Sequence, residues 1–112
     1  MSAPRLNRRL ILEEAQLTPD GAGGYVTTWM PLGALWAALQ PGAGRETGVQ
    51  DIRVSQISLT AVVRAAPLGA KSRPRPEQRF REGDRVFLIH AVHERAPDGL
   101  YLECKISEEV AT

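Results

Sequence analysis

The chain has 112 residues, a formal net charge of +1 and 43% hydrophobic residues, which suits one small core and argues against a wholly disordered protein. Its single cysteine, Cys104, cannot form an intramolecular disulfide, so a disulfide-stapled secreted scaffold is excluded. The longest uncharged apolar run, residues 32–39, is far shorter than the roughly 20 residues of a membrane-spanning helix, and the apolar stretch at 10–12 is too short for a signal peptide. We therefore expect one soluble domain over residues 1–112, with a core at about 6–106.

Short segments with β-strand character alternate with turns rich in glycine and proline. The predicted strands, in chain order, cover residues 9–13, 25–29, 35–39, 57–63, 85–92 and 100–104. The clearest is 57–63, in which every second residue from Ile57 to Val63 is apolar. The Asp98-Gly99 turn before the last strand predicts a hairpin.

Two long connections, residues 40–56 and 65–82, separate these strands. A short helix could run from Arg45 to Gln56, but glycines at 44 and 48 weaken it. Connections of this length are usually functional or partly disordered. The pattern predicts an all-β, mainly antiparallel fold: a small barrel or sandwich of about six strands with long loops and at most one short helix.

Positive charge is concentrated in the second long connection. The segment 71–81 has a net charge of +4, which leaves −3 for the rest of the chain, and its basic residues are Lys71, Arg73, Arg75, Arg79 and Arg81. Such a segment suits contact with phosphates or with an acidic neighbour. The alternative is a solvated loop in a chain that is rich in arginine throughout.

Sequence signatures of catalysis are missing, because the chain has no GxGxxG, P-loop, GxSxG or HExxH motif. Strict strand alternation would point His90 and His93 to opposite faces, which is poor geometry for one metal ion. Cys104 is interpreted as a small core residue. The pairs Glu13-Glu14 and Glu108-Glu109 should face opposite ways on their strands and be solvated. We predict a protein that is not an enzyme and has no cofactor and no metal site.

Few aromatic residues are placed to stack on nucleic-acid bases. Trp29, Trp36 and Phe87 fall within apolar patterns and are expected in the core. Only Phe80, between two arginines, is placed for stacking, and its alternative role is an anchor inside the barrel. A sequence-independent contact with phosphates stays open, because it needs only arginines.

Several landmarks occur together in a characteristic order: Leu6-Asn7-Arg8-Arg9 before the first strand, Trp29 and Trp36 flanking a proline, the stretch from Pro41 to Glu46, and Gly83-Asp84-Arg85-Val86-Phe87. From about Leu6 to Cys104 the chain resembles the phage head–tail joining family. These are the small head-completion proteins, also called adaptors or stoppers, of tailed phages and gene transfer agents. The chain departs from the family in its longer, Arg- and Pro-rich 65–82 loop and at 61–64, where the family often has an aromatic residue or a second arginine.

The resemblance implies a β-barrel subunit of a homo-oligomeric ring of six or twelve copies in the neck of the virion, assembled in the bacterial host cytoplasm. A portal or adaptor protein would lie above the ring, and a tail protein or tail terminator below it. Packaged double-stranded DNA would run through the channel. The ring would close the head after DNA packaging and provide the tail attachment site, with no catalysis and no membrane contact.

Two segments are candidates for contacts within such a neck. We expect the segment from Pro41 to Arg53 to face the lumen, where Arg45, Glu46, Asp51 and Arg53 could join neighbouring loops into a plug; the alternative is a simple surface crossover. The basic residues of 71–81 are expected to contact another ring or the DNA.

Other classes of function stay open. A tail terminator or tail-tube-associated ring protein would share the small β-rich subunit and differ only in its neighbours. A free-standing nucleic-acid-binding β-barrel would bind as a monomer with a steep dependence on salt. A small enzyme comes last, because the sequence supplies no nucleophile, base or metal site.

Overall fold

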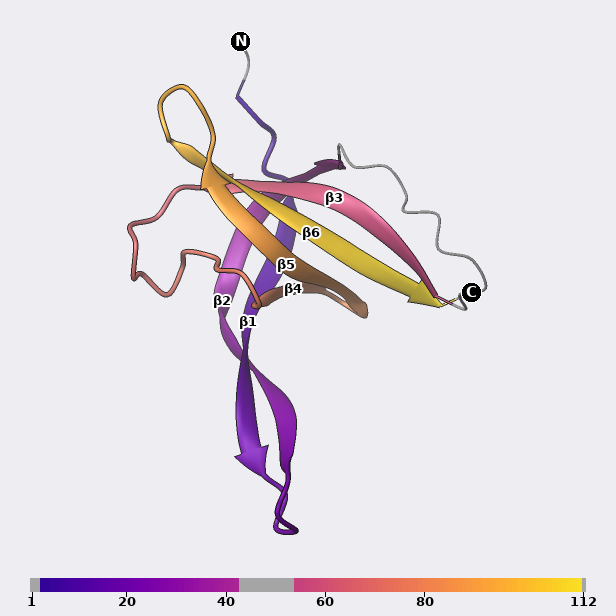
Figure 1. Ribbon diagram of the computed structural model, residues 1–112. Helices are drawn as coiled ribbons and strands as arrows, with labels where there is room; N and C mark the ends of the chain where they lie inside the picture. The colour runs from indigo at the N-terminus through magenta and orange to yellow at the C-terminus, as the bar shows by residue number, and fades with distance from the viewer. Residues whose placement is uncertain (1–2, 43–53, 112) are drawn as a thin grey trace.

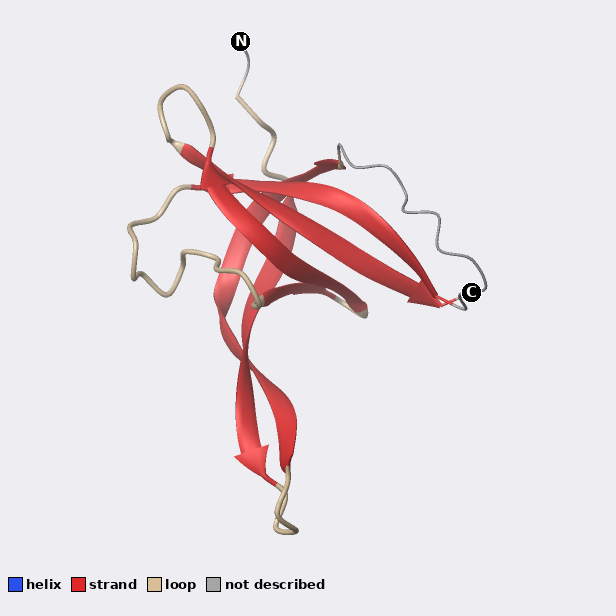
Figure 2. Ribbon diagram, in the orientation of Figure 1, coloured by secondary structure: helices blue, strands red, loops and turns tan. Residues whose placement is uncertain are grey.

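The structure, a computed structural model, describes residues 3–42 and 54–111. These residues form six antiparallel strands, β1 (Arg8–Pro19), β2 (Tyr25–Pro41), β3 (Val54–Arg64), β4 (Arg79–Glu82), β5 (Arg85–Glu94) and β6 (Tyr101–Ala111). They close into a barrel in the order β1-β2-β3-β6-β5-β4 (Figure 1). Figure 2 shows strands and loops, and no helix, within the described ranges. The prediction of an all-β, six-stranded barrel or sandwich is confirmed.

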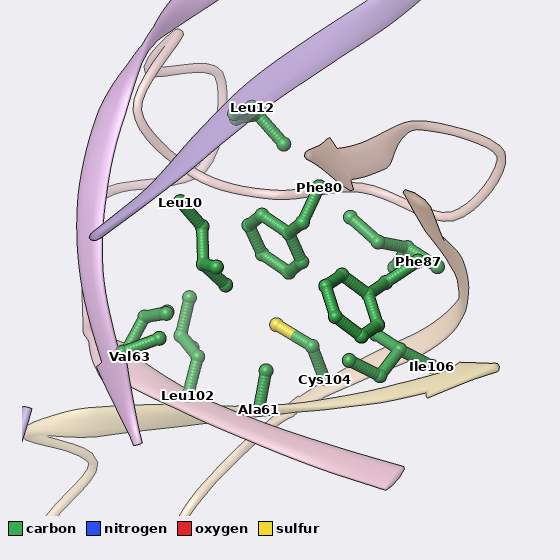
Figure 3. Packing of buried hydrophobic residues seen from close by; sticks show 11 residues of the cluster. Leu10, Leu12, Ala61, Val63, Phe80, Phe87, Leu102, Cys104 and Ile106 are labelled. Carbon is green, nitrogen blue, oxygen red and sulfur yellow. The ribbon is translucent and has the colours of Figure 1, made fainter. Parts of the chain in front are cut away.

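Alternating apolar side chains from all six strands fill the barrel interior (Figure 3). The buried cluster consists of Leu10, Leu12, Ala37, Ala61, Val63, Phe80, Phe87, Ile89, Leu102, Cys104 and Ile106. The two phenylalanines are its largest members and lie opposite each other in the β4–β5 pair. The smallest members, Ala37 and Ala61, come from β2 and β3, and such a mixture of large and small side chains suits close packing.

The long connection predicted at 65–82 ends earlier than expected, because β4 occupies its last four residues. Along β4, Arg79 and Arg81 point out of the barrel and Phe80 points in. Phe80 is fully buried, so its predicted stacking role is wrong and the alternative, an anchor inside the barrel, is correct.

The two strands predicted at 25–29 and 35–39 form one continuous strand, β2. The β1–β2 register shifts where Leu12 lies opposite Gly33 and Glu13 lies opposite Pro31, so Leu32 is the extra residue of a bulge. Gly33 there has φ +146°, a conformation that other residues rarely adopt. The proline and glycine that suggested a break in the strand therefore belong to a bulge.

Both tryptophans were expected in the core, and the structure corrects this. Ala37 is the inward residue of β2, so its neighbour Trp36 points outward and is 56% exposed. Trp29 is only half-buried, and the centre of its ring lies 4.1 Å from the guanidinium carbon (Cζ) of Arg79. Phe87, which was expected in the core together with the two tryptophans, is buried there.

A second bulge corrects the placement of the histidines. The β5–β6 register shifts between Ile89 and Ala91, which makes His90 the extra residue. His90 and His93 then both lie on the outer face of the barrel, where His90 is hydrogen-bonded to Ser107 Oγ at 2.6 Å and His93 Nε2 lies 3.5 Å from Glu103 Oε1. Strict alternation, which predicted opposite faces, fails at the bulge.

Cys104 is buried in the barrel as predicted, and burial raises the pKa of its thiol to about 12. Only the thiolate reacts readily with alkylating reagents. We expect iodoacetamide to modify the native protein at pH 8 on the order of 100-fold more slowly than the protein in 8 M urea, measured by mass spectrometry. Equal rates in the two conditions would contradict the buried placement.

Candidate assembly surfaces

Two of the predicted contact arginines are held by a buried carboxylate on β1. Glu13 is 4% exposed and accepts hydrogen bonds from Arg79 Nε at 2.7 Å and from Arg81 Nε at 2.9 Å. Although burial by itself raises the pKa of Glu13, the bonds from Arg81 and Arg79 outweigh it and lower the pKa. The expectation that Glu13 is solvated is wrong, because β4 pairs with β1 here and brings Arg79 opposite Glu13, with Arg81 two residues further along β4.

The remaining basic residues of 71–81 lie in the loop before β4. Arg75 Nη2 donates to Glu14 Oε1 at 2.7 Å, and Arg73 Nη1 donates to the carbonyl oxygen of Ala66 at 2.8 Å. Lys71 is exposed and lines a small pocket beside Glu14. Glu13 and Glu14 thus face opposite ways, as predicted, and together pair with three of the five cations.

A network of four charged side chains covers the end of the barrel where β1 begins and β4 turns into β5. Arg8 Nε donates to Glu82 Oε2 at 2.8 Å, and Arg85 donates two bonds to Glu108, at 2.8 and 2.9 Å. Arg85 Nη1 also lies 3.8 Å from Glu82 Oε1, which joins the two pairs. Glu108 is buried, which corrects the expectation that it is solvated.

The carboxylates of this network should make stability depend on pH. The hydrogen bond from Arg8 lowers the pKa of Glu82, and the bonds from Arg85 lower that of Glu108. A carboxylate whose pKa is lower in the folded state than in the unfolded state stabilises the fold at pH values above its unfolded-state pKa, about 4.3 for Glu. This stabilisation is lost as the pH falls through the folded-state pKa. We expect the urea midpoint to be nearly constant from pH 7 to about 5 and to fall steadily below about pH 4.5.

The control for this prediction is Glu82→Gln, which should lower the midpoint at pH 7 and make its fall at low pH smaller, because Glu108 and Glu13 keep their own contributions. A wild-type midpoint that is the same at pH 7 and pH 3 would contradict the role of the network.

The β1–β2 hairpin continues beyond the barrel as a two-stranded ribbon, residues 15–30, which we call the arm (Figure 1). It extends the molecule to 54 × 37 × 22 Å and raises the radius of gyration to 15.4 Å, against about 13 Å for a compact chain of this length. Its tip is a turn in which Asp20 Oδ1 accepts hydrogen bonds from the backbone of Ala22 and Gly24. The sequence pattern predicts a strand at 25–29 but ends the first strand at residue 13, before the arm begins, whereas β1 continues to Pro19.

The two faces of the arm differ in polarity. The register places Ala15, Leu17, Pro19, Tyr25, Thr27 and Trp29 on one face, and Gln16, Thr18, Val26, Thr28 and Met30 on the other. Asp20 is the single charged residue between positions 15 and 30, in a chain that is 24% charged. Depletion of charge and exposed aromatic residues are typical of the core of a protein–protein interface.

The predicted lumen-facing residues Arg45, Glu46, Asp51 and Arg53 lie outside the described residues. Of the short helix predicted at 45–56, the described part, residues 54–56, belongs to β3.

Neither a metal site nor a membrane-crossing helix occurs in the described part of the chain. No group of three or more His, Cys, Asp or Glu side chains there could hold a metal ion. In the same residues no helix combines the length and the apolar character that crossing a bilayer requires.

Comparison with known proteins gives two matches. The family model described as phage head completion protein matches residues 1–109. Among solved structures, a chain from the virion of a native gene transfer agent particle is 51% identical, with a TM-score of 0.83, over 98% of this chain and 100% of that chain. Among the curated proteins nothing matches.

Proposed function

The chain belongs to the phage head completion protein family, and from this membership we propose that it forms a ring in the neck of the virion that closes the filled head and provides the tail attachment site. The observation that carries the proposal is the match over nearly the whole chain to a protein of a gene transfer agent virion. The role is structural, in the virion, and it requires no catalysis.

The shape of the subunit favours ring assembly. A closed ring of identical subunits joins two different surfaces of each copy. The barrel and its arm offer surfaces that differ in charge and in polarity. A ring of six or twelve copies would lie below the portal or adaptor and above the tail or its terminator, around packaged DNA.

The two predicted contact segments keep their proposed roles. The segment from Pro41 to Arg53, with Arg45, Glu46, Asp51 and Arg53, would face the lumen and gate the channel. In the segment 71–81, Lys71 is the exposed cation outside the Glu13 and Glu14 pairs, so contact with an acidic neighbouring ring or with DNA would use it first.

Imaging of particles with and without this chain tests the proposal. We expect density for the chain as a ring at the neck, and filled heads without tails, leaking DNA, when its gene is deleted. Placement against the tail, with intact filled heads after deletion, would favour a tail terminator. Absence from the particle would contradict the proposal, and salt-dependent binding of nucleic acid by the monomer would then be the leading account.

A further inference from the structure

We propose that the apolar face of the arm binds the barrel of a second copy of this chain, at a row of arginine and aromatic side chains near the start of β1. This inference rests on the proposed ring and adds the subunit contact that would build it.

The arm requires a partner for physical reasons. An isolated two-stranded ribbon is marginally stable at best in water. Leu17 is 70% exposed and Tyr25 67% exposed, and both lie on the face that also carries Trp29. With one charged residue, an acidic one, the arm offers nothing that would attract phosphates. Its partner is therefore a protein surface.

A suitable surface lies on the outside of the same barrel. Arg9 pairs with Trp36 across β1 and β2, and Arg64 pairs with Tyr101 across β3 and β6. The β2–β3 register, continued one position beyond Ala37 and Val63, brings Trp36 opposite Arg64. The four side chains form a row that alternates between cation and aromatic ring, which we call the aromatic row, and the exposed Leu100 precedes Tyr101 in the chain.

The arm and the aromatic row complement each other in polarity and in charge. Trp36 and Leu100, 56% and 60% exposed, offer apolar area for Leu17 and Tyr25. The carboxylate of Asp20 at the tip of the arm would meet arginines of the row. Arg9 and Arg64 take part in no ion pair within the described residues. Arginine beside an aromatic ring is a frequent anchor in protein interfaces.

The two surfaces lie too far apart to meet within one subunit. About 30 Å of extended strand separates Arg9 from the tip of the arm, and Figure 1 shows the arm and the β5–β6 turn, which contains Leu100, at opposite ends of the molecule. A contact between two different patches is heterologous and closes into a ring when the rotation between copies permits. Because every copy of the chain carries one arm and one aromatic row, each arm in a ring finds one aromatic row on its neighbour.

Charge introduced on the apolar face of the arm tests the contact. Leu17→Lys and Tyr25→Lys should each reduce incorporation of the chain into particles at least tenfold. The matched control, Thr18→Lys, adds the same charge to the other face of the same strand and should incorporate normally. Unchanged melting temperatures of the purified variants would show that the barrel is intact. Equal incorporation of all three variants would overturn the inference.

A disulfide cross-link tests whether the arm binds the aromatic row of a second copy of this chain. Cys104 is buried, so thiols introduced together by Leu17→Cys and Leu100→Cys can be oxidised selectively with diamide in purified particles. We expect a ladder of multimers of this chain on a non-reducing gel, and no ladder from either single variant. A cross-link to a different virion protein, or none although the chain is in the neck, would overturn the inference and leave the proposed function standing. Absence of the chain from the neck would overturn both.

Discussion

Replacement of Phe80 by alanine is expected to lower the free energy of unfolding by about 3–5 kcal/mol, the usual cost of removing a fully buried phenylalanine. The ring is completely buried and lies against Phe87 in the middle of the core. It is also the inward apolar anchor of β4, the four-residue strand that joins β1 to β5 and closes the barrel. Equilibrium unfolding in urea, followed by tryptophan fluorescence, measures the effect.

Leu68→Ala serves as the control for this prediction. Leu68 lies in the loop before β4 and is 85% exposed, so its truncation should change the free energy of unfolding by no more than about 0.5 kcal/mol. A Phe80→Ala protein as stable as Leu68→Ala would contradict the placement of Phe80 in the core.

Replacement of Glu13 by alanine is expected to lower the free energy of unfolding by about 2–3 kcal/mol. The substitution removes one buried carboxylate and leaves Arg79 and Arg81 without the acceptor that both of them use. Loss of a hydrogen-bonded charge from a buried site is costly because its partners remain desolvated. Part of that cost is relieved here, since the Arg81 side chain is 40% exposed and regains contact with water.

The neighbouring residue provides a matched control. Glu14 pairs with Arg75, and these two side chains are 38% and 64% exposed, against 6% for Glu13, so Glu14→Ala should cost less than about 1 kcal/mol. Urea unfolding of the two variants at pH 7 makes the comparison. Equal losses would mean that the burial of Glu13 adds nothing to its ion pairs.

Much of the barrel can be predicted from local patterns. The alternation from Ile57 to Val63 marks β3, and the turn at Asp98-Gly99 marks the β5–β6 hairpin, because both signals lie within a few residues. Strand β4 gives a weak signal, since Phe80 is the one apolar residue among Arg79, Arg81 and Glu82. It pairs on one side with β1, about 70 residues away in the chain, and on the other with β5, across the turn at Gly83-Asp84.

The candidate surfaces were harder to predict than the fold. The cluster of cations at 71–81 is visible in the sequence, but its neutralisation by Glu13 and Glu14 depends on which strand lies next to β4. Trp36 was misplaced because an apolar neighbourhood does not reveal which residue of an alternating pair faces inward. The arm gives a weak signal for a similar reason, since residues 15–19 lie beyond the predicted strand at 9–13 and their strand character comes from pairing with residues 25–29.

The strand order has a consequence for biosynthesis. Of the six strands, β6 is synthesised last, and it lies between β3 and β5, so both of these strands keep an unpaired edge until synthesis reaches Tyr101 and beyond. Open edges of this kind invite pairing with other chains. A chain that stops before β6 lacks a central strand, and its barrel cannot close. Such a chain keeps open edges on β3 and β5, which favour aggregation or proteolysis over folding.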